Sequence, residues 1–330
     1  MAHDDSARLR AHALAIAAAE GEAALSGVAA AYGGYAARVA RWVSLVDRGA
    51  RAVCLGETAG RIPIFGLEVG AVDAKRASMV VAGLHAMEWI GVAVGEELLE
   101  RLVASPPRDR RVLAVPLANP DGYRAVEADL RAGRRRFRRT NARGVDLNRN
   151  WPTHHHAWSL RSKLVPPLGG PGRAPLSEPE IAGVVAWGDR VVADGARIDV
   201  ALSLHSFGRA ILYPYGGRWR APDEVARLRA SAQALAARIA GPYRVVQVAR
   251  WVPGAFAHGM ELDTMHARWG ATALLVECSA GGMSLAAPSS LVHPFRWFNP
   301  PTPSADVDEL APGLEALLRG SLVAQWPSAG

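Results

Sequence analysis

The 330-residue sequence contains only two cysteines, Cys54 and Cys278, which argues against both a disulfide scaffold and a cysteine-rich zinc module. It also lacks an uninterrupted apolar run of about 20 residues, the length that crosses a bilayer. The first 24 residues are acidic at their start and carry charged side chains within or beside the apolar stretch, unlike a secretory signal. We therefore predict a cytoplasmic location and no membrane partner.

Acidic residues are fewer than basic ones, 31 against 38, and the formal net charge is +7. One segment, residues 131–149, accounts for this excess because it contains eight arginines and a single acidic residue. Arginine clusters often bind nucleic acid, but Phe137 is the only aromatic residue interleaved with these arginines. We expect no nucleic-acid partner and interpret the segment as a solvated loop or as a rim that attracts substrate.

Half of the residues are hydrophobic, so the chain is able to bury a large core. Short apolar runs alternate with segments of helical periodicity. This alternation predicts an α/β fold with a mixed, mostly parallel central sheet and helices on both faces. The expected strands are residues 52–55, 61–68, 79–84, 112–117, 198–204, 210–213, 244–248 and 271–277. The expected helices are residues 7–31, 35–46, 90–103, 178–192, 223–239, 258–269 and 307–318.

Two further expectations concern the organisation of the chain. Residues 1–50 are expected to form an N-terminal helical extension that packs on a main domain of residues 51–330. Residues 120–175 contain many Arg, Gly, Pro and His residues and have little periodicity. We therefore predict a long irregular segment there, and segments of this kind are usually functional.

Polar side chains follow two of the apolar runs. His85 and Glu88 come directly after one run, and His205 ends another. The carboxyl ends of strands in an α/β sheet lie at the edge where ligands tend to bind. Two imidazoles and one carboxylate at that edge would make a three-ligand zinc site with an open fourth position, which is typical of catalytic zinc. Asp146 is a candidate acceptor for the free ring N–H of His85.

Other patterns in the chain offer alternative explanations. A second His-x-x-Glu occurs at His258 and Glu261, where both residues are also explained as polar groups at the start of a helix. The run of three histidines at 154–156 is a further candidate for metal binding, but it has no carboxylate close by. Taken alone, His85 is better explained as a polar residue near a core strand, and only the other motifs favour a ligand.

Several motifs occur in a fixed order, and together they resemble those of the zinc carboxypeptidases of the carboxypeptidase A type, the M14 metallopeptidases. The resemblance extends from about residue 60 to residue 281. The motifs are Gly60-Arg61-Ile62-Pro63, Gly83-Leu84-His85-Ala86-Met87-Glu88, Asn119-Pro120-Asp121-Gly122-Tyr123, Val145-Asp146-Leu147-Asn148-Arg149-Asn150-Trp151, Ser177-Glu178-Pro179-Glu180, Ser203-Leu204-His205-Ser206, Leu212-Tyr213-Pro214-Tyr215-Gly216 and Val276-Glu277.

The resemblance implies one Zn²⁺ ion per chain, bound by His85, Glu88 and His205. It also implies that Asn148 and Arg149 bind the terminal carboxylate of the substrate. The planar fork of an arginine suits a bidentate contact with a carboxylate. The expected partner is therefore a peptide with a free C-terminal carboxylate, and residues 51–330 form the catalytic domain.

The same resemblance gives roles in the reaction to two further residues. Glu277 is the general base and acid, which passes a proton from water to the leaving amine. Arg138 polarises the scissile carbonyl and stabilises the oxyanion that forms there. The register within the arginine run leaves Arg136 and Arg139 as alternatives to Arg138. A salt bridge at the end of a strand is the alternative explanation for Glu277.

The chain departs from the family pattern at the lid of the site. The family often has a mobile tyrosine upstream of the catalytic glutamate, but no tyrosine lies between Tyr243 and Glu277, and Trp251 is a candidate to replace it. Leu262 occupies the position expected to line the side-chain pocket, which indicates an apolar or aromatic C-terminal residue. If the alignment shifts by one residue, Glu261 or Asp263 takes this position, and an acidic side chain there would indicate a basic C-terminal residue in the substrate.

We therefore predict a metallocarboxypeptidase, a hydrolase of peptide bonds that is active without removal of an inhibitory pro-segment. Two alternatives stay open. One is an amide hydrolase or deacylase that acts on small N-acyl amino acids, and the other is a catalytically inactive peptide-binding module. The motifs at 148–151 and 203–216 favour the peptidase, and retention of all three ligands together with Glu277 argues against the inactive module.

Overall fold

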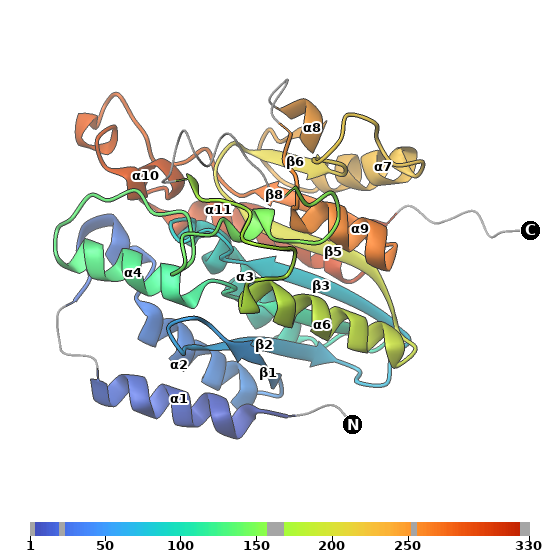
Figure 1. The fold of residues 1–330 in the computed structure, drawn as a ribbon, viewed down its shortest axis with the longest axis horizontal. Helices are drawn as coiled ribbons and strands as arrows, with labels where there is room; N and C mark the ends of the chain where they lie inside the picture. Colours follow the sequence, from blue (N-terminus) through green and yellow to red (C-terminus); the bar gives the residue numbers. More distant parts are fainter. Residues whose placement is uncertain (1–3, 20–23, 157–167, 252–255, 324–330) are drawn as a thin grey trace, which may run out of the picture.

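The computed structural model describes residues 4–19, 24–156, 168–251 and 256–323, and an eight-stranded sheet runs through this part of the chain (Figure 1). The strand order is β1-β2-β4-β3-β5-β8-β6-β7. The strands are β1 (Arg51–Glu57), β2 (Pro63–Gly70), β3 (Arg76–Ala82), β4 (Arg111–Val115), β5 (Arg197–His205), β6 (Ala210–Tyr213), β7 (Arg244–Gln247) and β8 (Thr272–Glu277).

The four central strands, β4, β3, β5 and β8, are parallel to one another. On either side of them, β2 pairs with β4 and β6 pairs with β8 in antiparallel orientation. The predicted α/β fold with a mixed sheet is thereby confirmed. The parallel centre matters for the site because it directs the carboxyl ends of β3, β5 and β8 to the same edge.

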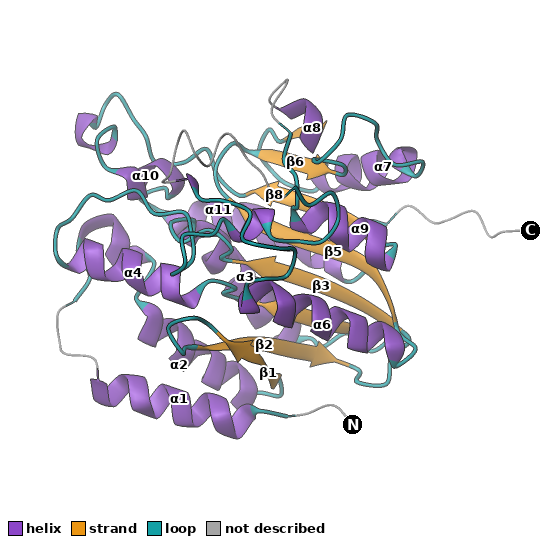
Figure 2. Cartoon of the chain, viewed as in Figure 1, coloured by secondary structure: helices purple, strands orange, loops and turns teal. Residues whose placement is uncertain are grey.

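Helices cover both faces of the sheet (Figure 2). The α-helices are α1 (Ser6–Ala19), α2 (Tyr35–Asp47), α3 (Trp89–Ala104), α4 (Pro120–Arg131), α6 (Pro179–Ala193), α7 (Val225–Ala236), α8 (Val248–Trp251), α9 (Glu261–Trp269), α10 (Pro294–Phe298) and α11 (Pro303–Leu318). Short 3₁₀ helices form at η1 (Gly27–Ala31), η2 (Leu147–Arg149) and η4 (Pro288–Ser290).

Strand β3 shows why the central strands read as continuous apolar runs. Met79 and Val81 belong to the core that includes α6 and α9. Val80 and Ala82 belong to the core on the opposite face, which includes α3 and α11. Successive side chains of a strand point to opposite faces, and because helices cover both faces, every residue of β3 after Arg76 is buried.

One expectation about the irregular segment is wrong. Residues 120–131 form helix α4 rather than irregular structure. The side chain of Asn119 caps this helix by accepting a hydrogen bond from the Gly122 amide at 2.9 Å, and Pro120 takes the first turn, where its missing N–H costs nothing. Tyr123 and Val126 then face the core. The Asn-Pro pair is therefore a helix start, and the charged residues that follow it form the polar face of an amphipathic helix.

The N-terminal helices pack on the β1 side of the sheet (Figure 1). Leu9 of α1 and Trp42 of α2 lie in the same apolar core as the side chains of α3. The expected single helix over 7–31 is instead α1 followed by the separate 3₁₀ helix η1. The division into an extension of residues 1–50 and a catalytic domain stays a prediction. Among the described residues, none of the helices combines the length and the apolar character required to cross a bilayer.

Candidate active site

The candidate site lies where the parallel strands β3, β5 and β8 end. In the register of the sheet, Ala82 of β3 pairs with Leu204 of β5, and the next residue of β5, His205, pairs with Glu277 of β8. Direct partners in a parallel pair project to the same face and lie about 4.8 Å apart. The sheet thus places His205 beside Glu277, and it brings the loop after β3 to the same edge.

That loop carries His85 and Glu88 between β3 and the first residue of α3. Gly83 at its start has a φ of +67°, and a Cβ there would lie 2.6 Å from Leu117 Cδ1. Glycine is therefore required both by the backbone conformation and by the close approach of Leu117. The turn that it permits reverses the chain tightly enough for His85 and Glu88 to face one another.

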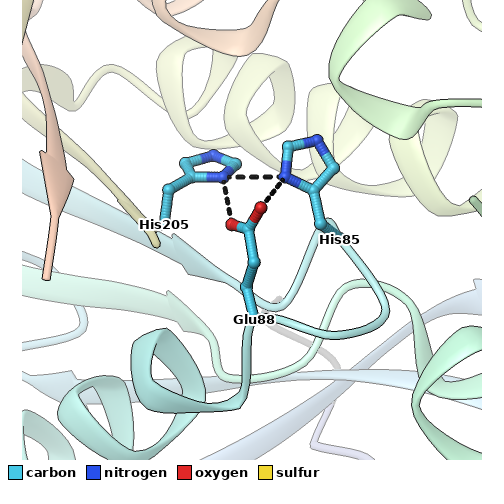
Figure 3. A group of neighbouring side chains, drawn as sticks. All are labelled: His85, Glu88 and His205. Atoms are coloured by element: carbon cyan, nitrogen blue, oxygen red, sulfur yellow. Dashed lines mark hydrogen bonds and ion pairs between the residues drawn. The ribbon is translucent and has the colours of Figure 1, made fainter. Parts of the chain in front are cut away.

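Two imidazole nitrogens and a carboxylate converge on one point (Figure 3). His85 Nδ1 lies 2.7 Å from Glu88 Oε1, and His205 Nδ1 lies 2.9 Å from Glu88 Oε2. The two Nδ1 atoms are 3.1 Å apart. Zinc bonds of about 2.0–2.2 Å place tetrahedral donors roughly 3.3 Å apart, so this buried donor set fits a single zinc ion. The structure brings together the three predicted ligands.

The buried residues of the triad shift the pKa values of one another. Burial would raise the pKa of Glu88, but His85 and His205 hold it below its usual range. Burial likewise would lower the pKa of His205, whereas its contacts with Glu261 and Glu88 raise it to about 10. The Ser206 amide also donates to Glu88 Oε2 at 3.0 Å. Glu88 is therefore held in the ionised form that a metal ligand requires.

Asp146 joins the metal triad to the substrate side of the site. Its Oδ1 lies 3.1 Å from His85 Nε2 and accepts a hydrogen bond from the backbone N–H of Asn148 at 3.0 Å. Its Oδ2 accepts from Arg139 Nε at 2.8 Å. Burial would raise the pKa of Asp146, but Arg139 above all, with Arg149 and His85, holds it well below the usual range. The contact expected between Asp146 and His85 is thus present.

A pocket of about 310 Å³ opens over the triad. Its polar wall is formed by His85, Glu88, Arg139, Asn148, Arg149, His205, Ser206 and Glu277. Its apolar wall is formed by Phe207, Leu212, Val248, Trp251, Ala257, Met260, Leu275 and Phe298. The two walls suit a ligand with an anionic group, a hydrolysable polar bond and an apolar side chain.

Glu277 faces this pocket at the end of β8. Burial, with a contribution from Glu88, raises its pKa to about 8 in the metal-free protein, although His205 and Arg139 oppose the rise. Glu277 Oε2 is buried and has no hydrogen-bond partner among the described residues. Among the described residues, no salt bridge to Glu277 is present, unlike the alternative role considered for it, and its side chain lines the pocket instead.

The arginine placed in the pocket is Arg139 rather than Arg138. Arg138 turns away and pairs with Asp129. Arg139 lines the pocket, and its Nη1 lies 3.7 Å from Glu88 Oε1. The assignment of Arg138 as the residue next to the scissile carbonyl is therefore not supported by its position. Arg139, one of the two alternatives in the same run, lines the pocket instead, and its Nε donates to Asp146.

Leu262 does not line the pocket, contrary to the expectation from its place in the sequence. Its side chain is fully buried in the core between α6, α9 and the sheet. The apolar wall comes from Met260 and Val248 among others. Trp251, the candidate substitute for the lid tyrosine, does line the pocket, whereas residues 252–255 that follow it lie outside the described part of the chain.

Glu261 contacts the site, although its pattern in the sequence was equally explained by a polar group at the start of a helix. Its Oε1 lies 3.0 Å from His205 Nε2, on the side of the ring that faces away from the triad. The second His-x-x-Glu therefore contributes only its glutamate, and α9 begins at Glu261 rather than at His258. In the 154–156 run, His154 pairs with Asp263 at 2.6 Å. Among the described residues, only His85, Glu88 and His205 form a metal-binding group of three.

A sequence model described as zinc carboxypeptidase matches residues 46–273, which is more than half of the chain. The match contains the three residues of the triad, together with Asn148 and Arg149. It ends four residues before Glu277, so the position of Glu277 rests on the strand register described above.

Individual relatives agree with that match. The chain is 28% identical over 211 residues to carboxypeptidase A4 of Mus musculus, covering 58% of this chain and 49% of that protein. It is 31% identical over 162 residues to zinc carboxypeptidase A 1 of Drosophila melanogaster, covering 46% of this chain and 36% of that protein. The chain thus spans about half or less of the length of these curated relatives. The solved structure of carboxypeptidase A from Helicoverpa armigera superposes with a TM-score of 0.66 at 21% identity, covering 96% of this chain and 80% of the other, which shows a shared fold.

Proposed function

Because this chain belongs to the zinc carboxypeptidase family, we propose that it is a metallocarboxypeptidase that hydrolyses the C-terminal peptide bond of peptides with a free terminal carboxylate. The observation that carries the proposal is the composition of one pocket. The donor triad, the unpartnered carboxyl of Glu277 and the cationic side chain of Arg149 all line it.

Binding of the substrate begins with its terminal carboxylate. Arg149 and Asn148 lie on the polar wall of the pocket, and a guanidinium with an amide N–H₂ matches the two oxygens of a carboxylate. The Asn148 Oδ1 atom accepts from the Glu261 amide at 3.1 Å, which turns the N–H₂ group of the same side chain toward other acceptors. A peptide that ends in an amide would lose the charge-assisted part of this contact.

The hydrolytic step adds water to the scissile carbonyl carbon and breaks the carbon–nitrogen bond. Zinc held by His85, Glu88 and His205 supplies Lewis-acid chemistry and a lowered pKa of water. Glu277 takes the proton that the attacking water loses and delivers a proton to the leaving amine. The raised pKa of Glu277 suits a carboxylate that must accept a proton near neutral pH, and bound zinc lowers that pKa because it adds positive charge.

Arg139 is proposed to stabilise the oxyanion that forms on the carbonyl. Its Nε donates to Asp146 at 2.8 Å, which restrains the orientation of the guanidinium, and the side chain lines the pocket. A donor that is already oriented stabilises developing charge without a reorganisation cost. We therefore assign to Arg139 the role that the family resemblance suggested for Arg138.

The apolar wall supports a preference for an apolar C-terminal residue. Leu212, Val248, Met260 and Leu275 contribute to it, and no carboxylate among the described residues of the pocket other than Glu88 and Glu277 is available to pair with a basic side chain. Burial of an apolar side chain there contributes about 25 cal/mol per Å² of surface removed from water.

The proposal is tested by incubating the zinc-loaded protein with a peptide library that differs only in the C-terminal residue. We expect release of single C-terminal residues, fastest for Leu, Met and Phe, and little release from the amidated forms of the same peptides. Equal cleavage of amidated and free-acid peptides would contradict the exopeptidase proposal. Stoichiometric zinc with no turnover across the library would indicate the inactive peptide-binding module instead.

A further inference from the structure

The imidazole of His205 has a carboxylate behind it that the proposed hydrolysis does not use. We propose that Glu261 is a positioning residue, which fixes His205 as a metal ligand and orients Asn148 toward the substrate. Glu261 is fully buried and His205 nearly so. The distance from Glu261 Oε1 to His205 Nε2 is 3.0 Å.

The first argument is the equivalence of the two histidines. His85 presents Nδ1 to the triad and has Asp146 Oδ1 at 3.1 Å from its Nε2. His205 presents Nδ1 to the triad and has Glu261 at nearly the same distance from its Nε2. A neutral imidazole that gives its Nδ1 lone pair to a metal carries its proton on Nε2 and requires an acceptor there. Glu261 provides that acceptor for His205, as Asp146 does for His85.

The second argument comes from the surroundings of the Glu261 carboxylate. Its Oε2 is buried and has no hydrogen-bond partner among the described residues. Its Oε1 contacts His205, a group of the site, and the described residues supply no arginine or lysine ion pair to Glu261. Burying a carboxylate that has no cationic partner from Arg or Lys lowers the stability of the fold. A role in positioning His205 explains why this loss of stability is retained. The loss is reduced because Glu261 is the first residue of α9, where the helix dipole stabilises a negative charge.

The third argument concerns the substrate side. The backbone N–H of Glu261 donates to Asn148 Oδ1 at 3.1 Å, and Asn148 Nδ2 lies 3.5 Å from His205 Nε2. Because His205 Nε2 carries the proton that Glu261 accepts, it offers no lone pair to the Asn148 amide. The N–H₂ group of Asn148 is therefore left for a ligand. One residue, through its side chain and its backbone, thus sets the orientation of a metal ligand and of a carboxylate-binding group.

The test separates the two contacts, because a substitution of Glu261 removes the carboxylate and retains the backbone N–H. We expect Glu261→Gln to weaken zinc binding by about 10–100-fold, measured by competition with a chromogenic chelator without any substrate. KM for free-acid peptides at saturating zinc is expected to stay within about twofold, since the Asn148 contact is retained. The cobalt-substituted variant is expected to show a shifted visible spectrum, because the geometry at His205 changes.

Two matched variants control this measurement. Asp146→Asn removes the equivalent carboxylate behind His85, so a comparable loss of zinc affinity is expected. Glu180→Gln removes a buried carboxyl on α6 that has an unpartnered oxygen but lies outside the pocket lining, so zinc affinity is expected to stay within about twofold.

A folded Glu261→Gln protein with unchanged zinc affinity and an unchanged cobalt spectrum would overturn the proposal. If Glu261→Gln does not yield folded protein, Glu261→Asp is measured in its place, since it retains the charge and shortens the side chain, and the same two outcomes decide. Because zinc affinity is measured without turnover, the result is independent of whether the peptidase proposal holds.

Discussion

His205 and Glu277 are direct partners in the parallel register of β5 and β8, which puts a proposed metal ligand and the proposed base on adjacent strand ends. Neither position depends on a flexible loop. The distance between the two functions is therefore set by the hydrogen bonds of the sheet, and a change in one residue is expected to leave the other in place.

Replacing Glu277 by Gln tests this separation. The variant is expected to bind zinc as the wild type does, because Glu277 is not part of the donor triad, and to lose about 10²–10⁴-fold in kcat through loss of the proton acceptor. Zinc content and steady-state kinetics on one free-acid peptide measure both quantities. Residual kcat within tenfold of the wild type would remove Glu277 from the mechanism.

Arg139 and Arg138 form a matched pair of neighbouring arginines. Arg139→Ala is expected to lower kcat by about 10²–10³-fold, the usual effect of removing one oxyanion donor. Arg138→Ala is expected to change kcat by less than threefold, because Arg138 pairs with Asp129 outside the pocket. The opposite order of effects would restore the assignment that sequence resemblance gave to Arg138.

Arg149→Lys changes the geometry of the anion contact while it retains the positive charge. A lysine cannot reproduce the planar fork that binds both oxygens of a carboxylate. We expect KM for free-acid peptides to rise about tenfold, equivalent to about 1.4 kcal/mol, with a much smaller change for the amidated peptides. An equal change for both kinds of peptide would show that Arg149 does not contact the terminal carboxylate.

The stability of the metal-free protein is expected to depend on the ionisation of Glu180. Burial raises the pKa of Glu180 from 4.5 to about 7, so the folded protein holds this proton more tightly than the unfolded chain. The stabilisation is fully present below about pH 4.5 and is lost as the pH rises through about 7. Glu180→Gln is expected to raise the free energy of unfolding at pH 8 by on the order of 2–3 kcal/mol, with little change at pH 4.

Urea unfolding at several pH values measures this difference. Chelator is present so that metal binding does not contribute to the pH dependence. Glu277, whose pKa is also raised in the metal-free protein, contributes equally to both proteins and cancels in the comparison. If the free energy of unfolding depends on pH in the same way for the wild type and Glu180→Gln, Glu180 is ionised in the folded state with an ordinary pKa, and the prediction is wrong.

Removal of the metal is expected to lower thermal stability. A ligand that binds only the folded state adds about 2.7 kcal/mol when its free concentration is 100 times its dissociation constant. We therefore expect the melting temperature of protein stripped of metal with EDTA to rise when zinc is added in excess of any chelator, and to increase with the free zinc concentration. His205→Gln, which removes one of the three donors, is expected to reduce this rise strongly; an undiminished rise would place the ion elsewhere.

Much of the fold could be predicted from local sequence patterns. The apolar runs that became β3, β5 and β8 were identifiable because a strand buried on both faces has no polar alternation, and the motif at His85 and Glu88 followed one of them. Helix α4 was missed because its charged residues were taken as part of the arginine-rich segment that begins at Arg131, although they form the polar face of an amphipathic helix. Its capping signal was present in the sequence.

The identity of the pocket residues was less accessible. Arg138 and Arg139 are adjacent and chemically identical, and only the pairing of one with Asp129 and the other with Asp146 distinguishes them. Leu262 and Met260 are both apolar and near in sequence, yet only Met260 lines the pocket. Which side of a helix start faces a pocket depends on how that helix docks, and docking is not a local property.

The sequence by itself determined which residue types were available for chemistry and which runs formed the sheet, because these follow from side-chain chemistry and local periodicity. Only the tertiary structure decided which of them meet. The register of β5 with β8 placed His205 beside Glu277, and the docking of α9 brought Glu261 behind His205. Contacts between residues 56 positions apart arise from packing, which no short stretch of the chain encodes.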